Sequence, residues 1–268
     1  GAPKVESTPS SFCRSTSIGS ASTSASSSAP SSPPCSPNRG CPLGVRTEPA
    51  ARQVVTIFDW DDTVLPTSFL YKHTSPADQE AVPEALQAIL RSIARAARTL
   101  LEHSIGSGET YIITNAMEDW VEHSAAKYLP ELVPLLRQVT IISARARFEE
   151  ELPGRASEWK QRAFLEVQES LDPSRPANLV VLGDSTHELE AARALGRVLG
   201  WRPGARAAGA PATAPASPAP ASGAGAWLKT VKFQESPSAE DVRKQLELVS
   251  TRFGQIVSAR KDLEIGLE

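Results

Sequence analysis

The stretch Val54-Val-Thr-Ile-Phe58, followed by Asp59-Trp60-Asp61-Asp62-Thr63, decides the fold and places the candidate site. Its first half is a short β-branched and aromatic run, which predicts a buried β-strand. Its second half puts three carboxylates within four residues of that strand's end. Carboxylates this close repel each other and lose hydration when buried, so a core would not hold them without a cation or a cationic side chain. The stretch therefore predicts a buried strand that ends in an acidic turn facing a positive charge.

Outward from this stretch, short apolar runs alternate with amphipathic segments, such as residues 81–102, where apolar residues recur in steps of three and four. We expect strands at 54–58, 111–113, 139–142, 178–182 and 227–233, and helices at 81–102, 117–128, 157–171, 185–196 and after 238. Ser157, Ser185 and Ser238 are the expected N-caps, and Gly196 the expected end of the fourth helix. This alternation predicts an α/β fold, a Rossmann-like three-layer α/β/α sandwich around a mainly parallel, five-stranded sheet.

The composition excludes several classes of protein. A formal net charge of −3 gives no whole-chain electrostatic reason to expect nucleic acid as a partner. No run of 18 or more apolar residues occurs, so no membrane-spanning helix is expected. The three cysteines, Cys13, Cys35 and Cys41, lie in the first fifty residues, which excludes a disulfide-stapled core and a Cys-rich zinc site from the rest of the chain.

Two segments have the composition of disordered chain. Residues 1–50 are dominated by Ser and Pro, and residues 202–226 by Ala, Pro, Gly and Ser, so neither buries enough apolar surface to offset the entropic cost of ordering its backbone. The remainder is expected to be one domain, 51–268, interrupted once at 202–226. The expected location is the cytoplasm. The tail is also poor in acids and carries three arginines, a composition typical of an organelle transit peptide, which is the alternative location.

Polar side chains follow several of the expected strands at the edge where an open parallel sheet binds its ligands. Asp59 and Asp61 follow the first strand, Thr114 and Asn115 the second, and Asp184 the fourth. Two acidic strand ends that face one crevice are a natural site for Mg²⁺, which takes a few carboxylate oxygens together with water and phosphate. The sequence therefore predicts a magnesium site at this edge.

Four motifs then resemble, in order, those of the haloacid dehalogenase superfamily. Ile57-Phe58-Asp59-Trp60-Asp61-Asp62-Thr63-Val64-Leu65 resembles the first motif, an aspartate-x-aspartate-x-threonine after a hydrophobic strand. Thr114 is similar to the second, a hydroxyl residue that ends a strand, and Lys160 to the third, a lysine near the start of a later helix. Gly183-Asp184-Ser185-Thr186-His187-Glu188 resembles the fourth, in which a glycine-aspartate pair is followed by another acid. The resemblance spans residues 53–190.

The resemblance implies a Mg²⁺-dependent phosphatase, a hydrolase of phosphate monoesters. Asp59 would be the nucleophile that forms an aspartyl-phosphate, and Asp61 would protonate the leaving group and later activate water. Mg²⁺ would be held by the side chains of Asp59 and Asp184 and by the backbone carbonyl of Asp61, with Glu188 as a further acidic contact.

The resemblance also implies that Thr114 and Lys160 hold phosphate oxygens, and we add Asn115, the neighbour of Thr114, to this group. Each assignment has a structural alternative. Thr114 could be the N-cap of the following helix, and Lys160 could be a solvated surface lysine, with Arg145 and Arg147 supplying the cation instead. If Ser157 is an N-cap, Lys160 opposes the helix dipole in the first turn, which a bound anion would explain.

Glu188 and Trp60 each have two interpretations. Ser185-x-x-Glu188 is a capping-box pattern, so Glu188 either contacts the metal or only caps its helix, and the family often has Asp at this position. The ring of Trp60 either flanks the site or packs inward.

No sizeable cap domain is expected, because residues 66–109 and 115–159 leave no room for one. An open site suits a large substrate such as a phosphoprotein, or a partner that closes it. Phe69, Leu70 and Tyr71, in the expected loop after the first motif, could form a small flap or pack inward.

Several functions are compatible with these motifs. The expected partner is a phosphorylated small molecule or protein, and nothing indicates nucleic acid, a membrane or a particular oligomeric state. One alternative is a phosphotransferase of the same family; another is a catalytically idle, HAD-like interaction or regulatory module with flexible arms. A phospho-accepting receiver domain fits less well, because it expects an Asp after the third strand, where the chain reads Ile142-Ser143-Ala144-Arg145.

Overall fold

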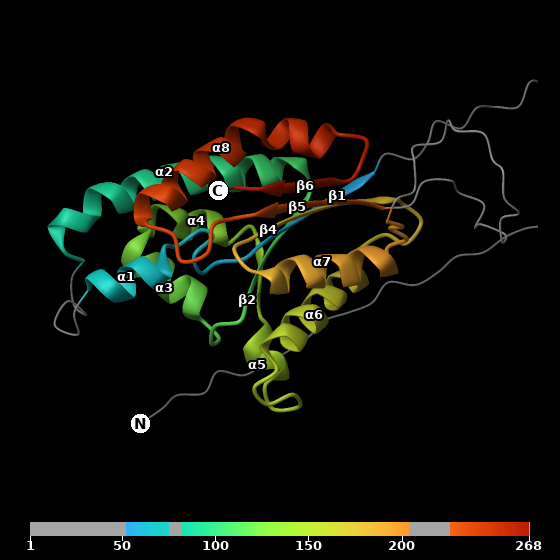
Figure 1. Ribbon diagram of the computed structural model, residues 1–268, viewed down its shortest axis with the longest axis horizontal. Helices are drawn as coiled ribbons and strands as arrows, with labels where there is room; N and C mark the ends of the chain where they lie inside the picture. The colour runs from blue at the N-terminus through green and yellow to red at the C-terminus, as the bar shows by residue number, and fades with distance from the viewer. Residues whose placement is uncertain (1–51, 75–81, 204–225, 268) are drawn as a thin grey trace, which may run out of the picture. The chain divides into compact units, whose positions relative to one another are not determined.

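A six-stranded sheet, in which all neighbouring strands are parallel, forms the centre of the protein (Figure 1). The computed structural model describes residues 52–74, 82–203 and 226–267. The expectations for the tail 1–50 and for residues 204–225 of the insert lie outside these ranges. The strands are β1 (Gln53–Phe58), β2 (Glu109–Thr114), β3 (Thr140–Ser143), β4 (Ala177–Gly183), β5 (Trp227–Lys232) and β6 (Leu263–Gly266), in the order β3-β2-β1-β4-β5-β6.

Helices cover both faces of the sheet, which makes a three-layer α/β/α arrangement consistent with a Rossmann-like fold (Figure 1). Helices α2 and α8 pack on one face, and α6 and α7 on the other. The helical segments are α1 (Thr67–His73), α2 (Glu84–Ser107), α3 (Trp120–Tyr128), η2 (Pro130–Leu132), α4 (Val133–Leu136), α5 (Ala144–Phe148), α6 (Ala156–Glu166), η3 (Val167–Ser170), α7 (Thr186–Val198) and α8 (Ala239–Ser258).

The central strands are apolar on both faces because helices bury both. On β1, Phe58 packs into the core beneath α2 and α8, whereas Val55 and Ile57 pack beneath α6 and α7. Val180 and Val181 divide in the same way on β4. This two-sided burial explains why the chain shows continuous apolar runs at these strands rather than an alternating pattern.

The prediction of five strands is wrong by one. The additional strand, β6, has only four residues and pairs with β5 from Lys229↔Leu263 to Lys232↔Gly266. Its alternate residues are half-buried and exposed, as expected at the edge of a sheet. A four-residue run with two apolar side chains is too short for periodicity to distinguish it from a loop.

Two of the helix ends expected from single capping residues are also wrong. The N-cap of α6 is Arg155 rather than Ser157, so Lys160 is the fifth helical residue and lies in the second turn. Gly196 does not end α7, which continues to Val198. Gly200 follows with a φ of 86°, the left-handed conformation that glycine adopts readily after a helix.

The segments after β1 and β2 add helices to the same core. Helix α1 occupies the expected loop after the first motif, and its Leu70 is buried in the core. The segment after β2 contributes Val121 and Leu132 to that core. All described residues belong to one compact unit. No helix in the described ranges combines the length and apolarity needed to span a bilayer.

Candidate functional site

The candidate site lies where the sheet changes direction. The chain passes from β1 outward to β2 and β3, and then returns to the other side of β1 to form β4, β5 and β6. Ligands of open α/β sheets bind at the carboxyl ends of the strands at such a switch point. Asp59 follows β1 and Asp184 follows β4, and the Asp59 amide donates a hydrogen bond to the Leu182 carbonyl at 2.9 Å. The two acids that the sequence singled out are therefore neighbours at this edge.

Lys160 lies between two carboxylates in this crevice. Its side chain is 3% exposed; its Nζ donates to Oδ1 of Asp59 and lies 2.7 Å from Oε1 of Glu188. Burial lowers the pKa of Lys160, but the charges of Asp59 and Glu188 outweigh burial and raise it above its usual range. Lys160 is therefore a protonated, buried lysine. The alternative of a solvated surface lysine is wrong.

The site holds more negative charge than Lys160 neutralises. Burial raises the pKa of Asp59 well above its usual value, although Lys160 opposes the shift. Burial, together with the charges of Glu188 and Asp62, raises the pKa of Asp184 to about 7. The pKa of a buried acid rises when its carboxylate lacks a sufficient positive partner. The crevice therefore favours a further cation.

Glu188 has two structural contacts at once. Its Oε2 accepts hydrogen bonds from the backbone amide, at 2.9 Å, and the hydroxyl of Ser185, which completes the capping box of α7. Its Oε1 pairs with Lys160. Gly183 makes this position accessible, because a Cβ atom there would lie 2.4 Å from Cγ of Glu188. The capping interpretation is confirmed, and the same side chain also forms part of the acidic crevice.

The carboxylate of Asp61 is held by three side chains. Oδ1 accepts hydrogen bonds from Thr67 Oγ1 at 2.6 Å and from Trp120 Nε1 at 2.9 Å, and Oδ2 accepts from Thr114 Oγ1 at 3.3 Å. Neither Thr67 nor Trp120 is marked by a motif in the sequence. Thr67 lies six residues after Asp61, whereas Trp120 begins a helix 59 residues away, and only the folded sheet brings it to Asp61.

Thr114 and Asn115 lie at the end of β2, beside the acids. Thr114 is not the N-cap of α3, which is Asp119; its hydroxyl instead accepts a hydrogen bond from the Ala116 amide at 3.0 Å. Asn115 donates from Nδ2 to the Ala156 carbonyl at 3.1 Å, which ties the end of β2 to the first turn of α6. Its Oδ1 is buried without a hydrogen-bond partner in the described part of the chain. Both residues are placed beside the crevice.

The alternative cations after β3 are engaged elsewhere. Arg145 pairs with Glu149 at 2.7 Å, and Arg147 pairs with Glu166. These pairs are substantially exposed, so they are ordinary surface interactions. Within the described ranges, Lys160 is thus the lysine or arginine that pairs with Asp59.

The aromatic side chains of the first motif and of α1 pack in different ways. Trp60 is fully buried and donates from Nε1 to Ser124 Oγ at 2.9 Å, so its ring packs inward rather than flanking the site. On α1, Leu70 is buried, Phe69 stacks on His73, and Tyr71 is 72% exposed. The three residues of the expected flap therefore point into different surroundings.

The donor atoms at this edge suit Mg²⁺, although no ready-made metal cage is present in the described residues, where no three His, Cys, Asp or Glu side chains are arranged to hold an ion. Mg²⁺ is usually bound by one or two carboxylates with water and phosphate rather than by an all-protein cage. Asp59 and Asp184 supply such carboxylates, and the raised pKa of Asp184 indicates uncompensated negative charge. The chemistry of these donors fits the ion.

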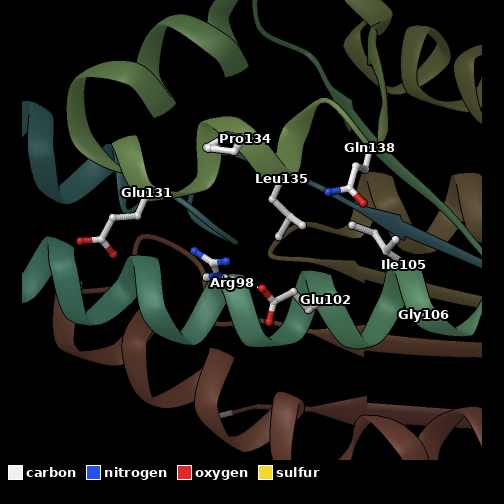
Figure 2. A pocket seen from close by; sticks show the side chains of 8 residues that line it. All are labelled: Arg98, Glu102, Ile105, Gly106, Glu131, Pro134, Leu135 and Gln138. Atoms are coloured by element: carbon white, nitrogen blue, oxygen red, sulfur yellow. Dashed lines mark hydrogen bonds and ion pairs between the residues drawn. The ribbon is translucent and has the colours of Figure 1, made fainter.

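Two surface pockets in the described part of the chain differ in their relation to this crevice. One of about 140 Å³ is lined by Thr114 and Trp120, the residues that bond to Asp61. A larger pocket of about 410 Å³ lies between α2 and the η2–α4 segment, and Figure 2 shows Arg98 and Glu102 on one side of it and Leu135 on the other. None of its lining residues is one of the candidate site residues at the ends of β1, β2 and β4, and Arg98 pairs with Glu102 at 2.8 Å. The smaller pocket is the one that adjoins the candidate site.

No protein-family model, curated protein or solved structure matches this chain. The geometry at the carboxyl ends of β1, β2 and β4 is therefore the basis for assigning a function.

Proposed function

We propose that the protein is a Mg²⁺-dependent phosphatase of the haloacid dehalogenase type, which hydrolyses a phosphate monoester through an aspartyl-phosphate. The observation that carries the proposal is the buried contact of Lys160 with Asp59, beside the uncompensated carboxylate of Asp184. A lysine and a divalent cation next to a carboxylate supply the charge that a phosphoryl group needs in order to approach that carboxylate. The four sequence motifs support the same chemistry.

Each residue would have a defined task. Lys160 bonds to Oδ1 of Asp59, which leaves Oδ2 to attack phosphorus while the bond to the leaving oxygen breaks. Asp61 would give its proton to that leaving oxygen and then take a proton from the water that hydrolyses the aspartyl-phosphate. Lys160, Thr114 and Asn115 would bind the phosphate oxygens.

Asp59, Asp184 and the backbone carbonyl of Asp61 would hold Mg²⁺, with Glu188 as a further acidic contact. When bound, Mg²⁺ neutralises the negative charge shared by the carboxylates and the phosphate. The proposed substrate is a large molecule such as a phosphoprotein. This proposal rests on the described segments after β1 and β2, which contribute to the core rather than to a separate cap.

The direct test is hydrolysis of an aryl phosphate by the full chain. We expect activity with MgCl₂, none with EDTA, and loss in Asp59→Asn, with a phosphorylated protein trapped by acid quenching in the wild type only. Asp172→Asn is the matched control, because Asp172 contacts Gln53 at the opposite end of β1. Full activity in a folded Asp59→Asn variant would refute the proposal. A phosphotransferase would form the same aspartyl-phosphate but transfer its phosphoryl group to an acceptor faster than to water.

A catalytically idle interaction module is the second candidate. It is favoured by the lack of three converging metal-ligating side chains in the described residues. Mg²⁺ titration followed by tryptophan fluorescence separates the two, because the Trp120 indole bonds to Asp61. The phosphatase predicts a saturable change that is lost in Trp120→Phe, whereas no response and no binding by calorimetry would favour the module.

A further inference from the structure

The two oxygens of Asp61 have different surroundings. Oδ1 accepts one hydrogen bond from α1, through Thr67, and one from the first residue of α3, through Trp120. Oδ2 has the longer contact with the Thr114 hydroxyl at the end of β2. Residues of α1, β2 and α3 therefore converge on one carboxylate, and Thr114 and Trp120 come from positions 53 and 59 residues away in the sequence.

These partners differ in the chemistry that they permit. An indole N–H can only donate, so Trp120 keeps a lone pair of Oδ1 engaged. Thr67 is 9% exposed and its hydroxyl engages the second lone pair of Oδ1 at 2.6 Å. With Trp120 on one lone pair, a proton on Oδ1 would require the Thr67 hydroxyl to reverse and to donate to the Leu65 carbonyl, at the longer distance of 3.3 Å, instead of to Asp61. The hydroxyl of Thr114 can either donate or accept, so Oδ2 can carry a proton and keep its neighbour.

The backbone around the site places these donors. Asp62 has a φ of 56° and Asp119 a φ of 62°, the left-handed conformation that Asp tolerates better than most residues. Asp62 Oδ1 accepts from the Ser68 amide at 2.8 Å, which fixes the first turn of α1, where Thr67 lies, against the acidic turn. Asp119 is the N-cap immediately before Trp120. One left-handed residue, Asp62, thus follows Asp61 directly, and the other, Asp119, directly precedes Trp120.

We propose that Trp120 and Thr67 are positioning residues that occupy Oδ1 of Asp61 and so direct its proton-carrying oxygen, Oδ2, to the leaving group. This inference rests on the proposed phosphatase reaction. In the first step the proton on Oδ2 passes to the bridging oxygen as its bond to phosphorus breaks, and Asp61 becomes a carboxylate. Without the two donors, the carboxyl group can rotate and present the wrong oxygen.

The kinetic test compares two substrates through kcat/KM, which reports the step that expels the leaving group. An alkyl phosphate needs a proton on its leaving oxygen, whereas 2,4-dinitrophenyl phosphate does not. We expect Trp120→Phe and Thr67→Val to lower kcat/KM for the alkyl ester about tenfold or more, a part of the roughly 10²- to 10⁴-fold that general acid catalysis contributes, and for the dinitrophenyl ester less than about twofold. Thr67→Ser, which keeps the hydroxyl, should retain the wild-type ratio of the two substrates.

A second measurement does not depend on turnover. The five tryptophans give five indole N–H signals in a ¹H–¹⁵N NMR spectrum of the metal-free full chain, and Trp120→Phe identifies one of them. We expect Asp61→Asn to shift that signal more than the other four, because a carboxylate acceptor becomes an amide. The Trp60 signal is the internal control, since Trp60 bonds to Ser124.

The outcomes separate the inference from the proposed function. Equal losses on both substrates, or none, would overturn the positioning role while leaving the phosphatase intact. An Asp61→Asn spectrum with an unmoved Trp120 signal would overturn the contact itself. A folded wild type that hydrolyses neither substrate would refute the phosphatase, and with it the acid role of Asp61.

Discussion

Glu188 Oε1 lies 2.7 Å from Lys160 Nζ, and both side chains are more than nine-tenths buried. Because the same lysine also bonds to Asp59, one cation joins the end of β1 to the first turn of α7. Buried charges of this kind are costly when one partner is removed, since the others remain desolvated without compensation. The arrangement has consequences for stability as well as for chemistry.

Replacing Lys160 with Met should destabilise the protein strongly at neutral pH. It leaves Asp59 and Glu188 buried without their cation, and loss of one partner from such a pair costs about 3–5 kcal/mol. Urea unfolding at pH 7.5 measures the change in the free energy of unfolding. Lys244→Met is the control, because Lys244 is 62% exposed and lies 3.8 Å from Glu240. A loss no larger than that of the control would show that the buried ion pair is absent in solution.

The raised pKa of Asp184 predicts opposite effects of pH on stability and on metal binding. With a folded pKa of about 7 against an ordinary value of 3.8, the folded state retains a proton that the unfolded state has lost. This group therefore makes the metal-free protein less stable as pH rises from about 4 to 7. Mg²⁺ needs the carboxylate, so its affinity should rise about tenfold between pH 6 and pH 8.

Asp184→Asn tests both effects in one variant. At pH 8 without metal, it should be more stable than the wild type by about 1–2 kcal/mol, because a repelled carboxylate is gone. Calorimetric titration should find its Mg²⁺ binding abolished. A variant less stable than the wild type at pH 8 would contradict the uncompensated charge, and pH-independent Mg²⁺ affinity in the wild type would contradict the role of Asp184.

Lys232 should influence the metal site from outside it. Its Nζ donates to the Asp184 carbonyl at 2.6 Å, so the end of β5 holds the turn after β4 in place. Residues that orient metal ligands typically contribute about 10- to 100-fold to affinity, and we expect Lys232→Met to weaken Mg²⁺ binding by about tenfold. Glu235→Gln is the control, because it removes the exposed partner of Lys232 but not the bond to Asp184. Equal affinities in the two variants would refute this role.

The sequence predicted the features that depend on local pattern. The strand over residues 54–58, the N-caps Ser185 and Ser238, and the position of acids after β1 and β4 all follow from short-range periodicity and capping chemistry, and the structure confirms them. The parallel sheet with helices on both faces followed from the alternation of these elements. The HAD-type chemistry of the site stays a prediction.

The features that the sequence does not reveal lack a distinguishing local signal. Ser157 resembles an N-cap and predicts Lys160 in the first helical turn, but α6 begins after Arg155. No motif marks Thr67 or Trp120 as a partner of Asp61, and only the adjacency of β1 and β2 brings α3, with Trp120, to that carboxylate. β6 is too short for its pattern to be distinguished from a loop.

Gly183→Ala should disturb the site without removing any polar group. Its Cβ would lie 2.4 to 2.9 Å from three atoms of Glu188, so that side chain must move away from Lys160 and Ser185. We expect a loss of about 1–3 kcal/mol in stability from overpacking, together with reduced phosphatase activity. Gly254→Ala is the matched control: no atom lies within 4 Å of its added Cβ, and alanine in the interior of α8 should stabilise the helix by about 0.5–1 kcal/mol. Thermal unfolding and aryl phosphate hydrolysis measure both variants. Equal stability and activity in the two would show that Glu188 does not need the space that Gly183 leaves open.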